Sequence, residues 1–230
     1  MSDTILILDT ATENCSAALY HNGQVFEDCA EAPREHSQRI LPMVESLLSQ
    51  AQISLDDAAV IAFGCGPGSF TGIRIGTAMV QGLALGAELP VLPLSNLAAM
   101  AQGAINAGAT EVVAAIDARM GEVYFGHYRA EEGLAVLQGQ EVVIKPDTLQ
   151  PQLDAIGQAT TAVGTGFETY PQLIANQHIE ADTSCRLPSA AMMMPLAQHG
   201  WRTDAAISID DVEPVYLRNE VTWKKLPGRE

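Results

Sequence analysis

The apolar positions at the start of the chain alternate between short buried runs and stripes at helical spacing. Ile5 to Leu8 is an uninterrupted apolar run that ends at Asp9, and Asn22-Gly23 separates two further β-prone segments, as in a tight hairpin. From Ile40 the apolar residues recur on one helix face, with Pro42 placed either to begin that helix or to kink it. The pattern predicts three strands followed by alternating helices and strands, βββαβαβα.

The second half of the sequence repeats the beginning of the first. A strand over Val112 to Ile116 runs into Asp117, as the first strand runs into Asp9, and further β-prone segments follow it up to Ile144. We therefore predict an internal duplication with two facing lobes. The apolar periodicity from Ala190 to Trp201 predicts a helix that covers the second lobe. The expected organisation is an N-terminal lobe over 1–107, a smaller lobe over 108–211, and a tail over 212–230 that is free to pack back on the first lobe.

Composition limits the partners that the surface can attract. The 230 residues are 47% hydrophobic, and 12 Lys and Arg stand against 28 Asp and Glu, which gives a formal net charge of −16 at pH 7. This field repels phosphodiester chains, so direct binding of a nucleic acid is disfavoured. No apolar run approaches the roughly 18 residues of a membrane span, and the first residues lack the basic segment of a signal peptide. We expect a cytoplasmic protein without membrane contact.

Cysteines and histidines give no sign of a metal site. The four cysteines form no C-x-x-C pair, and no two of the five histidines are spaced as H-x-x-x-H. We therefore expect reduced thiols, and neither a bound metal nor another cofactor.

Two polar features leave their function open. The glycine-rich segment from Gly64 to Gly72 leads from a strand into a helix and could offer backbone N–H groups to a phosphate, yet it matches neither the Walker loop nor G-x-G-x-x-G. It is either a phosphate site or a tight strand-to-helix turn. Asp9 and Asp117 likewise either hold a metal-nucleotide between the lobes or cap the turns after their strands.

A stripe of small residues marks the helix that begins near Ile73. Ala78, Gly82 and Gly86 follow one another at intervals of four, beside Met79 and Leu83. A glycine inside a helix costs about 1 kcal/mol relative to alanine, so close approach of another backbone is the expected compensation. That backbone belongs either to the protein's own sheet or to another subunit.

Four segments of the sequence form a recognisable set: Asp9 to Thr12, Gly66 to Gly76, Ala115 to Tyr124 and Pro214 to Arg218. Together they resemble the bacterial TsaB family, the accessory subunits of tRNA threonylcarbamoyladenosine synthesis formerly called YeaZ. The resemblance implies an α/β protein with the two-lobed actin/hexokinase/Hsp70-like fold, a duplicated RNase H-like fold. It also implies a homodimer when alone, a heterodimer with the catalytic paralogue TsaD, and recruitment of the ATPase TsaE in a ternary complex, with tRNA contacted only indirectly.

The resemblance also implies a pseudo-enzyme. Catalytic paralogues carry a metal-binding His pair on the helix that here has Asn96 and Met100, and a Ser-Gly-Gly-type phosphate loop where this chain has Asp117 to Met120. We therefore expect no catalytic residue. The predicted partner interface is Ile40, Leu41, Val44, Leu48, Ala78, Met79, Gly82, Leu83 and Gly86. The predicted vestigial nucleotide cleft is Asp9, Thr10, Gly68, Ser69, Asp117, Arg119, Gly164 and Gly166.

Two other functions stay open on the sequence. One is an enzyme of the same fold, either an ATP-dependent small-molecule kinase or a glycoprotease-like hydrolase. The other is a purely structural homodimer with an unrelated partner. The basic tail, with Arg218, Lys224, Lys225 and Arg229, could touch tRNA or a partner.

Overall fold

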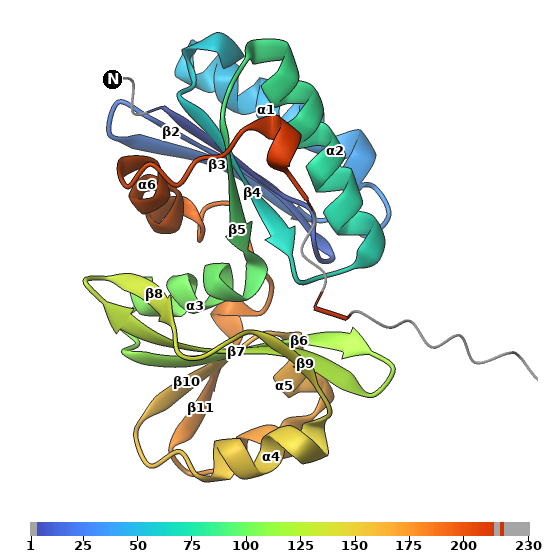
Figure 1. Cartoon of the computed structure of the whole chain (residues 1–230), viewed down its shortest axis with the longest axis vertical. Helices are drawn as coiled ribbons and strands as arrows, with labels where there is room; N and C mark the ends of the chain where they lie inside the picture. The colour runs from blue at the N-terminus through green and yellow to red at the C-terminus, as the bar shows by residue number, and fades with distance from the viewer. Residues whose placement is uncertain (1–3, 214–216, 219–230) are drawn as a thin grey trace, which may run out of the picture.

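The computed structural model describes residues 4–213 and 217–218, which form two lobes stacked along the long axis of the molecule (Figure 1). The first lobe is built on a five-stranded sheet with strand order β3-β2-β1-β4-β5. Its elements occur in the predicted order βββαβαβα. They are β1 (Ile5–Asp9), β2 (Asn14–His21), β3 (Gln24–Glu31), α1 (His36–Ala51), β4 (Val60–Gly66), α2 (Phe70–Ala87), β5 (Val91–Ser95) and α3 (Asn96–Asn106), with a 3₁₀ turn at Leu55–Asp57.

Both faces of the first sheet are apolar. Because successive side chains of a strand point to opposite faces, Leu6 and Leu8 of β1 pack towards α1 and α2, while Ile5 and Ile7 pack on the other side. The predicted hairpin turn is confirmed, since Asn22 and Gly23 adopt φ values of 50° and 81°. Helix α1 begins at His36, so that Pro42 lies inside it and not in its first turn.

The second lobe repeats the first, which confirms the predicted duplication. Its strand order is β11-β10-β6-β7-β8, with β9 also paired to β7. Read from β8, this order matches β3-β2-β1-β4-β5, with antiparallel strands followed by parallel ones in both lobes. The elements are β6 (Glu111–Arg119), β7 (Glu122–Glu131), β8 (Leu134–Leu137), β9 (Val142–Ile144), α4 (Pro146–Asp154), β10 (Thr160–Val163), α5 (Thr165–Thr169) and β11 (Ile179–Asp182), with 3₁₀ turns at Pro171–Ile174 and Thr183–Cys185.

The prediction that the helix near Ala190 covers the second lobe is wrong. This helix, α6 (Met194–Arg202), shares a core cluster with Ile5, Ile7 and Leu92 of the first sheet. After it the chain stays on the first lobe, where Ile207 pairs with Val91 and a 3₁₀ turn follows at Ile209–Asp211. Periodicity identified a helix with an apolar face, but it carries no information about which sheet still has a face to cover.

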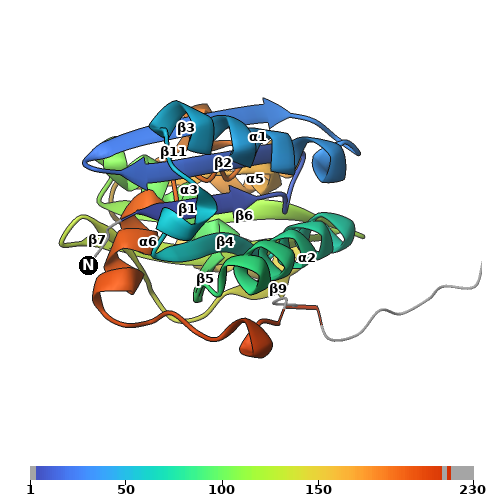
Figure 2. The ribbon, with the colours of Figure 1, turned by 90° about the horizontal axis from the view of Figure 1, so that it is seen from above.

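Helix α3 lies between the two sheets (Figure 1), and Figure 2 shows the same stacking from above. Its apolar residues belong mainly to the core of the second lobe, with β6 and β7, while Ala99 packs in the core of the first. The layers are therefore α1 and α2, the first sheet, α6 and α3, the second sheet, and α4 with α5. This duplicated arrangement is the actin/hexokinase-like fold. None of the helices within the described residues is long and apolar enough to cross a membrane.

Candidate functional site

Asp9 is the last residue of β1, and only 1% of its surface is exposed. Its Oδ1 accepts hydrogen bonds from Asn96 Nδ2 at 2.6 Å and from the Ala11 N–H at 3.3 Å, while Oδ2 has no partner among the described residues. Burial raises the pKa of Asp9 to about 7, against the opposing effect of the Asn96 hydrogen bond. The contact with Ala11 is the turn-capping arrangement that was one of the two interpretations of this residue.

The glycine-rich loop after β4 packs against the turn that follows β1. Thr10 Oγ1 donates to the Gly72 carbonyl at 2.8 Å, and the Ser69 N–H donates to the Ala11 carbonyl at 2.7 Å. A Cβ atom on Gly68 would lie 2.4 Å from the Ala11 oxygen. Ser69 caps α2 by accepting the Gly72 N–H. The chain's own backbone thus accounts for these glycines, which favours the tight strand-to-helix turn over a phosphate site.

A Gly68→Ala variant tests this explanation of the loop. We expect the free energy of unfolding to fall by about 1–3 kcal/mol, because the added methyl group meets a backbone oxygen that cannot move without displacing the β1–β2 turn. Urea unfolding measures the change. Gly157→Ala is the matched control, since nothing lies within 4 Å of its added Cβ. Equal stability of the two variants would show that the loop does not need Gly68.

The second lobe contributes a matching turn. Asp117 Oδ1 accepts the Arg119 N–H at 2.9 Å, so this aspartate also caps the turn after its strand, and Thr165 Oγ1 accepts the Asp117 N–H at 3.1 Å. Gly164 has a φ of 103°, and a Cβ atom there would lie 2.2 Å from the Ala115 carbonyl oxygen. The glycines before and within α5 therefore pack on β6 as Gly68 packs on the end of β1.

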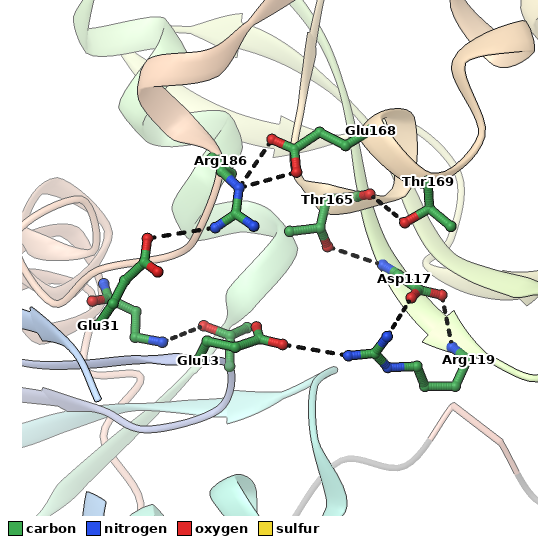
Figure 3. A network of polar contacts seen from close by, with 10 residues as sticks. Glu13, Glu31, Asp117, Arg119, Thr165, Glu168, Thr169 and Arg186 are labelled. Carbon is green, nitrogen blue, oxygen red and sulfur yellow. Dashed lines mark hydrogen bonds and ion pairs between the residues drawn. The ribbon is translucent and has the colours of Figure 1, made fainter. Parts of the chain in front are cut away.

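Two arginines connect the two lobes beside these turns (Figure 3). The Arg119 guanidinium contacts Asp117 Oδ2 at 3.1 Å in its own lobe and Glu13 Oε1 at 3.5 Å in the first lobe. Arg186 contacts Glu168 at 3.0 Å and Glu31 at 3.5 Å in the same manner. The structure thus brings the predicted cleft residues together in two sets, one in each lobe, with arginines between them.

The residues at this site do not fit a metal-nucleotide. Asn96 and Met100, at the positions that the resemblance assigns to metal-binding imidazoles, are completely buried on α3. Met100 packs against Gly164, and the Oδ1 atom of Asn96 accepts the Gly66 N–H at 2.9 Å. Among the described residues, no group of three or more His, Cys, Asp or Glu side chains is arranged to hold a metal ion.

A second candidate surface lies on α1 and α2, which are side by side on the outer face of the first sheet (Figure 1). Ala78, Gly82 and Gly86 are exposed, and nothing lies within 4 Å of a Cβ atom added to either glycine. Packing on the protein's own sheet therefore does not explain this stripe. Met79 and Leu83 are half-buried beside it, where they pack on the first core.

Two predicted interface residues belong to the core instead of the surface. Ile40 is completely buried and Val44 is 2% exposed, and both pack with Leu6 and Leu19 under α1. Neither side chain is available to a partner, so their assignment to the interface is wrong. Their neighbours Leu41, 37% exposed, and Leu48, half-buried, remain accessible.

Sequence analysis missed two large apolar side chains at the ends of the same stripe. Phe70 is 64% exposed and Leu85 is 71% exposed, and the Arg74 guanidinium stacks on the Phe70 ring, 3.2 Å from its centroid. Phe70 and Arg74 precede Ala78 at the same spacing of four residues. Extending the spacing of four from Ala78 towards the N-terminus would have found Phe70 and Arg74.

Described residues beyond α6 contact both lobes. Val212 packs in the core of the first lobe, whereas the Arg218 guanidinium contacts Glu122 Oε2 at 2.6 Å and the Ala118 carbonyl at 3.3 Å in the second lobe. The predicted basic residues Lys224, Lys225 and Arg229 lie outside the described residues.

Comparisons with known proteins agree on one family. Residues 29–225 match the family model of TsaD, tRNA N6-adenosine threonylcarbamoyltransferase. The chain is 47% identical, over 98% of its length and 99% of the relative, to the tRNA threonylcarbamoyladenosine biosynthesis protein TsaB of Escherichia coli strain K12. It is 45% identical, over 99% of its length and 98% of the relative, to TsaB of Haemophilus influenzae.

A solved structure gives the same answer. YeaZ from Pseudomonas aeruginosa superposes with a TM-score of 0.86 at 41% sequence identity, covering 94% of this chain and 100% of that one. Both the sequence and the fold are therefore matched over almost the whole length. The chain belongs to the TsaB (YeaZ) family of tRNA threonylcarbamoyladenosine biosynthesis proteins.

Proposed function

We propose that this chain is a non-catalytic subunit of the machinery that adds threonylcarbamoyl groups to the adenosine beside the anticodon of tRNA. In this role it binds the catalytic paralogue TsaD through α1 and α2, activates it, and helps to recruit the ATPase TsaE. Without TsaD the same face pairs with a second copy. Transfer of the group and most contacts with tRNA belong to the partner, in keeping with the net charge of −16.

One observation carries this proposal: the exposed stripe on α2. Nothing lies within 4 Å of a Cβ atom added to either of its glycines, and two large apolar side chains, Phe70 and Leu85, stand at its ends. A flat, largely uncharged helix face of this kind lets a second helix approach closely. A stable interface buries about 1,000 Å² or more in total, which a pair of adjacent helices can supply.

The contacts in the cleft support the non-catalytic part of the proposal. The glycine loop packs on the protein's own backbone, and a guanidinium stands between carboxylates of the two lobes. A kinase or a hydrolase of this fold needs those positions for its ligand. No contact among residues 4–213 and 217–218 favours either of these alternatives.

Reconstitution of the modification tests the proposed function. Purified TsaD from the same source, TsaE, ATP, the threonylcarbamoyl adenylate and tRNA are incubated with and without this chain, and the modified nucleoside is measured by mass spectrometry. We expect modification to fall by at least about 100-fold when the chain is omitted, because the partner lacks its docking surface. The chain and tRNA with the adenylate alone should give none.

Two results would reject the proposal. Modification by this chain without TsaD would make it an enzyme, and full activity of TsaD and TsaE without the chain would make it dispensable. Tight binding of Mg-ATP by the isolated chain in a calorimetric titration would favour the kinase-like alternative.

A further inference from the structure

Charged side chains of this protein bridge the two lobes on both sides of the cleft. Oppositely facing carboxylates attract a cation, and the N-terminus of a helix attracts an anion. In this chain, arginine side chains take the position of the cation and a glutamate side chain takes the position of the anion. The residues that each of them contacts come from different lobes.

Two arginines provide the cations. Arg119 contacts Asp117 at 3.1 Å and, across the cleft, Glu13 at 3.5 Å. Arg186 contacts Glu168 at 3.0 Å in the second lobe and Glu31 at 3.5 Å on β3 (Figure 3). Each guanidinium therefore holds one carboxylate of each lobe.

A glutamate provides the anion at the start of α3. Ser95, the last residue of β5 in the first sheet, caps this 11-residue helix by accepting the N–H groups of Leu97 and Ala98. Its hydroxyl donates to Glu141 Oε1, which belongs to the segment between β8 and β9 of the second lobe. Glu141 thus places a negative charge at the positive end of α3.

A second hydrogen bond, from Tyr128 of the second lobe, also holds the Glu141 carboxylate. The Tyr128 hydroxyl donates to the same Oε1 atom at 2.5 Å, and only 1% of this tyrosine is exposed. Burial, and next the Glu141 carboxylate, raise the pKa of the Tyr128 phenol, so the hydroxyl remains a donor. The hydrogen bonds of Ser95 and Tyr128 to Glu141 are partly buried, so they contribute more than the ion pairs of an arginine whose side chain is 76% exposed, such as Arg119.

We propose that the chain supplies its own interlobe ligands: Arg119 and Arg186 take the place of a bound cation, and Glu141 takes the place of a bound anion. Together they hold the lobes in one closed arrangement without nucleotide. Of these contacts, Glu141 contributes most. This inference concerns the relation between the lobes and does not depend on the partner-binding face of α1 and α2.

The distance between the lobes can be measured with paired spin labels on the full chain. Labels are attached to Gln24→Cys on β3 and Glu180→Cys on β11, two exposed positions, in a Cys29→Ser background where the remaining three cysteines are buried. We expect one narrow distance distribution that Mg-ATP does not change. Glu141→Ala should make it about twofold wider, and adding Arg119→Ala and Arg186→Ala should widen it further.

Arg129→Ala is the matched control, because it removes an ion pair with Glu111, at 3.0 Å, inside the second lobe. Its distribution should stay narrow. If Glu141→Ala does not fold, Glu141→Gln removes the charge at almost constant volume and should still widen the distribution. Three results would each overturn the proposal. They are a change in the distance distribution on adding Mg-ATP when none of the bridging residues is substituted, a narrow distribution in the triple variant, and a distribution for Arg129→Ala as wide as that for Glu141→Ala.

Discussion

A Gly82→Leu variant is expected to lose binding to TsaD by at least about 100-fold while the isolated chain becomes no less stable. Gly82 is exposed, and nothing lies within 4 Å of a Cβ atom added there, so the monomer has room for the leucine. Leucine also favours a helix over glycine by roughly 1 kcal/mol. In the complex, the same side chain would occupy the space into which the partner's backbone approaches. Calorimetry with purified TsaD measures the loss, and urea unfolding measures the stability.

Gly157→Leu is the control for this experiment. Gly157 is also exposed and without neighbours, but it lies in the second lobe, after α4. This variant should bind TsaD as the unmodified chain does. Undiminished binding by Gly82→Leu would show that α2 is not the docking helix. In sedimentation equilibrium, the same substitution should also abolish the homodimer, since we propose one face for both pairings.

The elements of the fold were accessible to sequence analysis because their signals are local. The apolar run before Asp9, the Asn22-Gly23 turn and the repeated strand-to-Asp pattern at Asp117 each depend on a few neighbouring residues. The destination of α6 depends instead on which sheet face is left uncovered by all other elements. Helical periodicity cannot supply that information.

The candidate site also combines features that neighbouring residues reveal with features that depend on the whole fold. The small-residue stripe on α2 was visible as a spacing of four, but the exposure of the predicted interface residues was not. Ile40 and Leu41 of α1 are adjacent and both apolar, yet one is in the core and the other on the surface. Arg119 was expected in the cleft, but Arg186 was not, because its partner Glu31 is 155 residues away. Contacts at that separation follow only from the assembled lobes.

An Asp9→Asn variant is expected to be more stable than the unmodified chain at pH 8, by about 2–4 kcal/mol, and equally stable near pH 4. Burial raises the pKa of Asp9 from 3.8 to about 7 in the folded state. The folded protein therefore binds a proton that the unfolded chain releases, and the contribution of Asp9 to stability falls as the pH rises from about 4 to 7. Asparagine keeps the acceptor for Asn96 Nδ2 and removes the buried charge.

Asp57→Asn provides a control of opposite sign. The backbone N–H of Ser54, and next its hydroxyl, lower the pKa of Asp57, so its contribution to stability is present above pH 3.8 and is lost as the pH falls through the folded-state pKa. Urea unfolding between pH 4 and 8 should therefore show a stability difference that grows with pH for Asp9→Asn and a loss of stability at pH 8 for Asp57→Asn. A pH-independent difference for Asp9→Asn would mean that Asp9 ionises at the same pH in the folded and unfolded states, and burial would then not raise its pKa.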